Sequence, residues 1–222
     1  MSDRSLQANS RRQFIKRMSV GAVALPVVSM VEKWLGGSSL ASFAQAREEC
    51  EWCGAMDAPP NPPSRIVIPP KGEPGEPLVI SGTVYKEDGK TPAAGILIYV
   101  YHTNAAGIYA KGTPDTGRPQ WRHGYLRGWM RTGEDGRYEF RTIKPGGYPG
   151  RPDPAHIHFT VSGTNYPEYP GGFLFADDSR VTPEVRARND AQKAPGAILT
   201  LRLDERGVLH GTHDIKLKRL PN

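Results

Sequence analysis

The fold is decided by residues 128–142, which run Gly128-Trp129-Met130-Arg131-Thr132-Gly133-Glu134-Asp135-Gly136-Arg137-Tyr138-Glu139-Phe140-Arg141-Thr142. Two short strand-like segments flank Glu134-Asp135-Gly136, a turn sequence typical of a β-hairpin. Working outward, further strand patterns lie at 78–85, 96–101, 156–162, 173–175, 198–203 and 208–217. The segment 96–101 is apolar throughout, which predicts a strand buried on both faces, and Asp204-Glu205-Arg206-Gly207 marks another hairpin. Many short strands at this spacing predict an all-β fold, a β-sandwich.

The sequence offers one good helix candidate, 183–192. Thr182 can cap its first turn, Pro183 suits the first helical position, and Glu184 complements the helix dipole. Residues 103–127 are polar and aromatic with little strand character, and a loop of this length in a compact domain is usually functional or disordered. We therefore expect a β-sandwich with long active-site loops and one short helix, spanning residues 78–222.

The N-terminal 46 residues have the features of an export signal. Ser10-Arg11-Arg12-Gln13-Phe14-Ile15-Lys16 fits the twin-arginine motif, 19–30 is mildly apolar, and Ala44-Gln45-Ala46 is a small-x-small cleavage site. The alternative is a cytoplasmic basic amphipathic helix. The order of the three features favours the twin-arginine export machinery as a partner and a periplasmic or secreted mature protein, with no membrane span after cleavage.

Charge argues against nucleic acid as a partner. Residues 1–46 hold six of the 29 Lys and Arg residues and two of the 23 Asp and Glu residues, so the remainder carries 23 basic and 21 acidic side chains. The formal charge of +6 is therefore concentrated in the leader. A nucleic-acid-binding domain needs a basic face on its folded part, which this balance does not favour.

Residues 47–77 are rich in proline and lack periodicity, which predicts an extended segment lying over the domain. They contain Cys50 and Cys53, spaced Cys-x-x-Cys. A redox dithiol is one interpretation, but prolines rather than a helix follow, and a zinc site lacks two further ligands nearby. In an oxidising compartment the spacing favours a small structural disulfide.

The informative motif for function is His156-Ile157-His158, within a predicted strand. Residues two apart in a strand point to the same face, so both imidazoles would enter one space while Ile157 packs on the other side. Two neighbouring imidazoles are natural ligands of a shared metal. The alternative is a solvated strand face, which this motif alone does not exclude.

Two tyrosines lie near this motif in the sequence. Tyr148 occupies a sharp turn eight residues before His156, in a connection stiffened by prolines. Tyr109 follows Gly107-Ile108 on a segment without strand character. A loop tyrosine is ordinarily a surface residue, so neither position is informative alone.

In combination, these residues resemble the intradiol ring-cleavage dioxygenases, such as the protocatechuate and catechol dioxygenases. The resemblance runs from Gly82 to about Val161 and is carried by Ser81-Gly82-Thr83-Val84, Asn104-Ala105-Ala106-Gly107-Ile108-Tyr109, the stretch from Gly136 to Pro149 and Pro154-Ala155-His156-Ile157-His158-Phe159. It implies a β-sandwich and a non-haem Fe(III) ion held by Tyr109, Tyr148, His156 and His158. Phenolate oxygens are hard anionic donors that favour Fe(III), and imidazoles suit iron as well.

The resemblance also implies the reaction. A small aromatic diol would chelate the metal and displace Tyr148, and O₂ would open the ring between the two hydroxylated carbons to give a muconate-type diacid. The family usually has an arginine three residues before the first histidine, where this chain has Asp153. Arg151 is our candidate to replace it. The family also tends to carry a glutamine where this chain has Gly171-Gly172.

Two other functions stay open. A non-catalytic transthyretin-like or carboxypeptidase-regulatory-like module would explain the strands, but not Tyr109 or the two histidines. A copper or zinc protein would combine the histidine pair with His102 or His123. Further residues that could contact a carboxylated or bulky substrate lie in the 103–127 loop; they are Arg118, Trp121, Arg122 and Arg127. The sequence does not indicate the oligomeric state.

Overall fold

The structure is a computed structural model that describes residues 53–112, 122–191 and 196–218. The export signal, Cys50, Arg118 and Trp121 lie outside these ranges, as does the predicted disulfide. Among the described residues, no helix is both long and apolar enough to cross a membrane.

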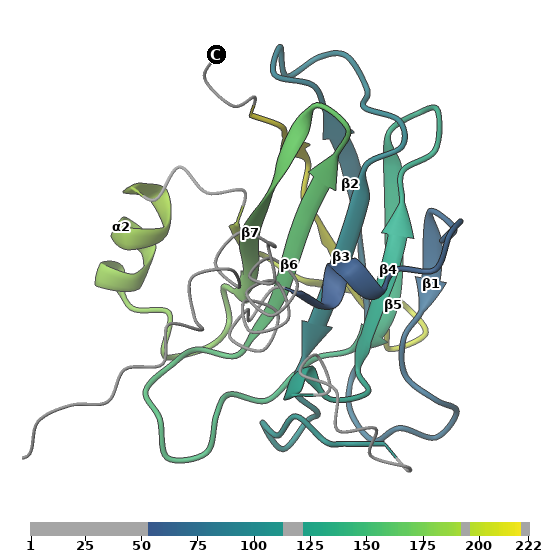
Figure 1. Cartoon of the computed structure of the whole chain (residues 1–222). Helices are drawn as coiled ribbons and strands as arrows, with labels where there is room; N and C mark the ends of the chain where they lie inside the picture. The colour runs from purple at the N-terminus through teal and green to yellow at the C-terminus, as the bar shows by residue number, and fades with distance from the viewer. Residues whose placement is uncertain (1–52, 113–121, 192–195, 219–222) are drawn as a thin grey trace, which may run out of the picture. The chain divides into compact units, whose positions relative to one another are not determined.

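Two β-sheets form a sandwich, which confirms the predicted fold class (Figure 1). One sheet has the strand order β1-β5-β2-β10-β9, with β11 also paired to β2, and the other has the order β4-β3-β6-β7-β8. The strands of the first sheet are β1 (Arg65–Val67), β2 (Pro77–Tyr85), β5 (Arg137–Ile143), β9 (Arg202–Leu203), β10 (Leu209–Thr212) and β11 (Ile215–Lys216). Those of the second are β3 (Leu97–His102), β4 (Arg127–Arg131), β6 (His156–Gly163), β7 (Tyr166–Phe175) and β8 (Ala197–Leu199).

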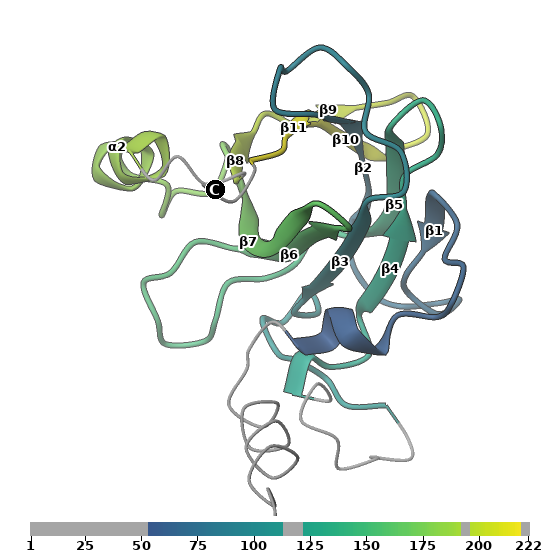
Figure 2. The same ribbon diagram turned by 45° about the horizontal axis from the view of Figure 1, so that its top comes forward.

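The core lies between the two sheets, whose arrangement Figure 2 shows. Most strands contribute alternate apolar side chains to it. Strand β2 contributes Leu78 and Ile80, β5 contributes Phe140, and β6 contributes Ile157 and Phe159. The outer face of β3 is buried as well, because the short 3₁₀ helix η1 (Cys53–Asp57) packs against it. The predicted burial of this strand on both faces is confirmed.

The predicted hairpin at Glu134-Asp135-Gly136 is wrong. Strands β4 and β5 belong to different sheets, β4 pairing with β3 and β5 with β2. The turn itself is present, since the Gly136 amide donates to the Gly133 carbonyl at 2.9 Å. It carries the chain across the sandwich, because a turn sequence specifies a chain reversal but not the sheet that the next strand joins.

Other elements agree with the prediction or extend it. The loop 204–207 does join the antiparallel pair β9 and β10. Helix α2 (Pro183–Ala191) begins at the predicted proline, and the Val185 amide donates to the Thr182 hydroxyl at 3.3 Å. Strand β7 (Tyr166–Phe175) is longer than the predicted strand at 173–175, since it begins earlier and runs through Pro167 and Pro170. Within 47–77, the predicted extended segment contributes η1 and the edge strand β1.

Candidate metal centre

The two predicted histidine ligands project from the outer face of β6. Ile157 between them is fully buried in the core, as the strand period predicts. The Nε2 atoms of His156 and His158 lie 2.9 Å apart. The strand therefore brings both imidazole nitrogens to one point outside the sandwich.

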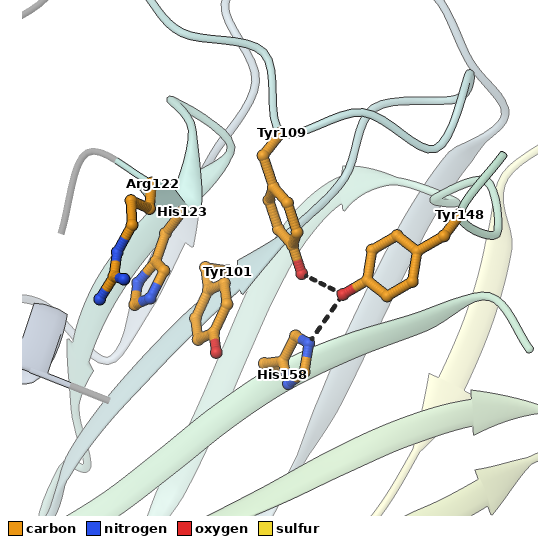
Figure 3. Close-up of a pocket in the computed structure, with 6 residues that line it drawn as sticks. All are labelled: Tyr101, Tyr109, Arg122, His123, Tyr148 and His158. Atoms are coloured by element: carbon orange, nitrogen blue, oxygen red, sulfur yellow. Dashed lines mark hydrogen bonds between the residues drawn. The ribbon is translucent and has the colours of Figure 1, made fainter. Parts of the chain in front are cut away.

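The two predicted tyrosines meet the histidines there, and Figure 3 shows both tyrosines beside His158. The Tyr148 hydroxyl lies 3.1 Å from Nε2 of His156 and 3.4 Å from Nε2 of His158. The Tyr109 hydroxyl lies 2.7 Å from that of Tyr148. Four donor atoms from three separate segments of the chain thus converge in one cluster.

Glycines hold the two tyrosine loops together. A Cβ on Gly107 would lie 2.1 Å from the Gly147 carbonyl oxygen, and one on Gly146 would lie 2.4 Å from the Ala105 carbonyl oxygen. The Gly146 amide also donates to the Asn104 carbonyl at 2.9 Å. The loops can approach this closely only because these residues have no side chain.

The start of β6 is fixed by hydrogen bonds on both sides of Ala155. Nδ1 of His156 lies 2.7 Å from the Pro154 carbonyl oxygen, so it must carry the proton and leave Nε2 with a lone pair. The Ala155 amide donates to the Asp178 carboxylate at 2.7 Å. Arg180 donates to the Asp153 carbonyl at 3.1 Å and lies against Gly147. These contacts tie the His156 ring and the Tyr148 loop to the turn that follows β7.

Burial keeps His158 neutral. Loss of hydration is the main cause that lowers the pKa of His158 to about 3, and the nearby His156 adds to the effect. A histidine must be deprotonated at the coordinating nitrogen to bind a metal. His158 is therefore neutral at neutral pH and carries no positive charge that would oppose a metal cation.

The cluster fits a metal ion. Ligand atoms about 2.0–2.1 Å from a first-row metal and about 90–110° apart are separated by about 2.9–3.4 Å, close to the distances of 2.7 to 3.4 Å seen here. Among the described residues, no group of three or more His, Cys, Asp or Glu side chains could hold a metal. Any metal at this cluster therefore depends on the tyrosines, and two phenolates with two imidazoles suit Fe(III).

The other two candidate histidines lie elsewhere. His102 is buried on the far side of β3, where Nε2 contacts the Thr142 hydroxyl at 2.6 Å and Nδ1 the Thr103 carbonyl at 2.7 Å. His123 is separated from His158 by the ring of Tyr101, which stacks against both. Neither completes a three-histidine site with the pair on β6, which argues against the copper or zinc alternative.

A cavity of about 240 Å³ opens beside the cluster. Its described lining consists of Tyr101, Tyr109, Arg122, His123, Tyr148 and His158 (Figure 3). This volume is below the roughly 300–1,000 Å³ of sites for drug-sized ligands, which suits a single aromatic ring. Three of the four candidate ligands therefore face a space of the right size for a small aromatic molecule.

Comparison with known proteins identifies this combination. A family model described as Dioxygenase matches residues 63–218, most of the chain. The chain belongs to the intradiol ring-cleavage dioxygenases. Catechol 1,2-dioxygenase 1 of Acinetobacter lwoffii is 40% identical over 115 residues, and the protocatechuate 3,4-dioxygenase beta chain of Burkholderia cepacia is 38% identical over 129 residues. These matches cover 45% and 51% of this chain but only 35% and 54% of those relatives.

Solved structures agree with this family. The dioxygenase domain of a carbohydrate-binding fusion protein from Streptomyces sp. SirexAA-E has a TM-score of 0.52 at 28% identity, covering 73% of this chain and 92% of that one. Catechol 1,2-dioxygenase of Acinetobacter sp. ADP1 has a TM-score of 0.56 at 23% identity, covering 74% of this chain and 59% of that one, which supports the fold alone. Membership of the intradiol dioxygenases favours a catalytic protein over the non-catalytic β-sandwich module.

Two positions at which the resemblance leads us to expect other residues, Asp153 and Gly171-Gly172, lie beside the cluster. Asp153 forms an ion pair with Arg151 at 2.9 Å, and Arg151 also lies over the Tyr148 ring, 5.5 Å from its centroid. The hydrogen bond from Arg151 lowers the pKa of Asp153, so this carboxylate is ionised at neutral pH. Gly172 pairs with His158 across the sheet, while Gly171 faces inward, where a Cβ would lie 2.4 Å from the Phe159 ring.

Sequence reasoning missed Tyr101, Asp178 and Arg180, and considered His123 only as a metal ligand. Tyr101 and His123 stack beside His158, and Asp178 and Arg180 hold the segment that leads into β6. Because side chains alternate along β3, Tyr101 lies on the other face of the strand from Ile98 and Val100. The sequence could therefore have predicted the face on which Tyr101 lies. No pattern in the sequence gives its register against β6 or joins the turn after β7 to the Tyr148 loop.

Proposed function

We propose that this chain is a non-haem Fe(III) dioxygenase that cleaves catechol-type aromatics between the two hydroxylated carbons. The proposed ligands are Tyr109, Tyr148, His156 and His158. The observation that carries the proposal is the convergence of their four donor atoms within 2.7 to 3.4 Å along the cluster. Family membership supports the same reaction class.

The overall reaction needs no external reductant. Both atoms of O₂ enter the substrate, one carbon–carbon bond of the ring breaks, and the product is a muconate-type diacid. When bound, Fe(III) supplies a Lewis acid and a template for both diol oxygens and raises the electron density of the ring toward O₂. The protein must hold the ring, exclude other ligands and take up the diol protons.

Tyr148 is the proposed proton acceptor. Its hydroxyl oxygen contacts three other donor atoms of the cluster, and its loop is the one that glycines allow to approach Tyr109. In its phenolate form, Tyr148 would take one substrate proton at its oxygen. His156 and His158 would stay in place, since β6 is paired on both sides within its sheet.

Arg151 is the proposed replacement for the family arginine. Its guanidinium lies over the Tyr148 ring, on the loop that the substrate would contact. The ion pair with Asp153 holds it there but also neutralises part of its charge. We propose that Arg151 stabilises negative charge on the bound diol, more weakly than an unpaired arginine would.

Oxygen uptake by iron-loaded protein, measured against a panel of catechols, tests the proposed activity. The expected result is one O₂ consumed per catechol, with a product 32 mass units heavier that absorbs as a muconate. Tyr148→Phe and His158→Ala should lose this uptake, and Arg122→Gln, in the pocket wall, should change the preferred catechol but keep the reaction. No oxygen uptake on any catechol by protein with one iron per chain would refute the proposal.

We also propose that the twin-arginine machinery exports the folded protein to the periplasm or beyond. The motif Arg11-Arg12 with its apolar run and cleavage site supports this. Replacing both arginines with lysine should leave the uncleaved precursor in the cytoplasm, as cell fractionation would show. Export of the double variant at the normal level would contradict the proposal.

A further inference from the structure

Tyr101 and His123 form a stack on one face of His158. The rings of Tyr101 and His158 are 4.6 Å apart between centroids and 9° from parallel, and those of Tyr101 and His123 are 3.8 Å apart and 8° from parallel. Tyr101 is thus sandwiched between two imidazoles. The proposed mechanism gives neither Tyr101 nor His123 a role.

The stack follows from the sheet register. Tyr101 of β3 pairs directly with His158 of β6, so both side chains stand side by side on the outer face. The His123 end of the stack is fixed, since Nδ1 of His123 contacts the buried Tyr99 hydroxyl at 2.8 Å. Gly54 of η1 lies directly against the Tyr99 ring, where a Cβ would be 2.2 Å from it. Tyr101 therefore has little freedom to move away from His158.

The two candidate histidine ligands are oriented by different means. His156 has a hydrogen bond from Nδ1 to the Pro154 carbonyl, the usual way to fix a metal-binding imidazole. Within the described residues, the contacts of His158 involve Nε2 and the ring faces, and none is a hydrogen bond from Nδ1 to the protein. The stack against Tyr101 restrains the plane of the His158 ring from its face.

We propose that Tyr101, held by His123, is a positioning residue that fixes the plane of the His158 imidazole and so strengthens metal binding. The electron-rich face of a phenol ring attracts an imidazole that becomes electron-poor on binding a cation. The stack therefore favours the metal-bound form of His158 over the free form. This inference rests on the proposed function, because it requires His158 to be a ligand.

The test compares Tyr101→Leu with Tyr101→Phe. Iron affinity is measured by competition with a chelator, together with the visible band of tyrosinate bound to Fe(III) and the thermal unfolding of the metal-free protein. Loss of an orienting contact typically weakens metal binding about 10- to 100-fold, so Tyr101→Leu should lose at least about 10-fold in iron affinity. Tyr101→Phe keeps the ring and should stay close to the wild type.

Trp129→Leu is the matched structural control. Trp129 belongs to the same aromatic cluster and stacks on Tyr99, with ring centroids 5.4 Å apart, but no ring contact joins it to His158. It should lower the unfolding temperature of metal-free protein as Tyr101→Leu does, while keeping the wild-type iron affinity.

Three results would overturn the inference. The first is wild-type iron affinity in Tyr101→Leu. The second is an equal loss of iron affinity in Tyr101→Phe, which would assign the effect to the hydroxyl. The third is an equal loss of iron affinity in Trp129→Leu, which would assign the effect to general packing. If the wild-type protein takes up no iron, both the proposed function and this inference fail. If the wild-type protein takes up iron and Tyr101→Leu binds it equally well, only this inference fails.

Discussion

Gly107→Ala should separate the two tyrosine loops of the proposed iron site. Gly107 has a φ of 78°, and a Cβ there would lie 2.1 Å from the Gly147 carbonyl oxygen. Real Cβ atoms keep at least 3.0 Å from other atoms, so one loop must move by about 1 Å, which exceeds the roughly 0.5 Å within which ligands must be held. The hydroxyl contact between Tyr109 and Tyr148, now 2.7 Å, lies within the affected loops.

The expected loss of stability has two parts. An alanine with positive φ costs about 1–2 kcal/mol, and inserting a methyl group into filled space costs about 1–3 kcal/mol more. Gly95→Ala isolates the first part, because Gly95 has a φ of 74° and nothing within 4 Å of its Cβ position. The free energy of unfolding should therefore be about 2–5 kcal/mol lower in Gly107→Ala than in the wild type, and only about 1–2 kcal/mol lower in Gly95→Ala.

Denaturant unfolding of metal-free protein measures this difference, and iron titration measures its effect on the site. Gly95→Ala should bind iron as the wild type does, since it lies far along the chain from every proposed ligand, whereas Gly107→Ala should bind it at least about 10-fold more weakly. Equal stability of the two variants, combined with wild-type iron affinity in Gly107→Ala, would refute the claim that close backbone approach holds the tyrosines together.

Three further predictions follow from contacts around the site. Burial lowers the pKa of His102 to about 4 from an ordinary 6.5, so His102 should account for up to roughly 3 kcal/mol of the stability that metal-free protein loses as pH falls from 6.5 to 4, in addition to the loss due to His158, and a flat profile by denaturant unfolding would contradict this. Asp178→Ala removes the acceptor of the Ala155 amide and should cost about 1.5–3 kcal/mol in unfolding free energy, with faster iron release to a chelator; unchanged release would show that this contact does not hold the site. Arg151→Gln should lower kcat/KM for catechols with iron content unchanged, and steady-state kinetics beside Asp153→Asn would separate the two charges, whereas unaltered kcat/KM would remove Arg151 from the mechanism.

Much of the fold was predictable because local patterns determine it. Strand period placed both histidines of His156-Ile157-His158 on one face, and the turn sequence correctly marked a chain reversal before Arg137. What failed was the sheet assignment of β4 and β5, because pairing partners depend on packing across the sandwich. Strand β7 was underestimated because prolines within it argue against a strand unless its pairing tolerates them.

The four candidate ligands could be predicted from the sequence, but the residues that orient them could not. Family resemblance and residue chemistry together indicated the two tyrosines and two histidines. The contacts that orient them come from residues remote in sequence, such as Tyr101 against His158 and Asp178 against Ala155. Such contacts depend on strand register and on where a turn lies in space, which one sequence does not encode as a local pattern.

The central claim is that Tyr109, Tyr148, His156 and His158 hold Fe(III). Metal analysis combined with the visible spectrum of the protein, purified without chelator, tests it most directly. We predict one iron per chain and a strong tyrosinate-to-iron absorption that Tyr148→Phe alters and His158→Ala abolishes together with the metal. A colourless protein without iron, or a Tyr148→Phe variant with the full wild-type spectrum and activity, would contradict the proposed metal centre.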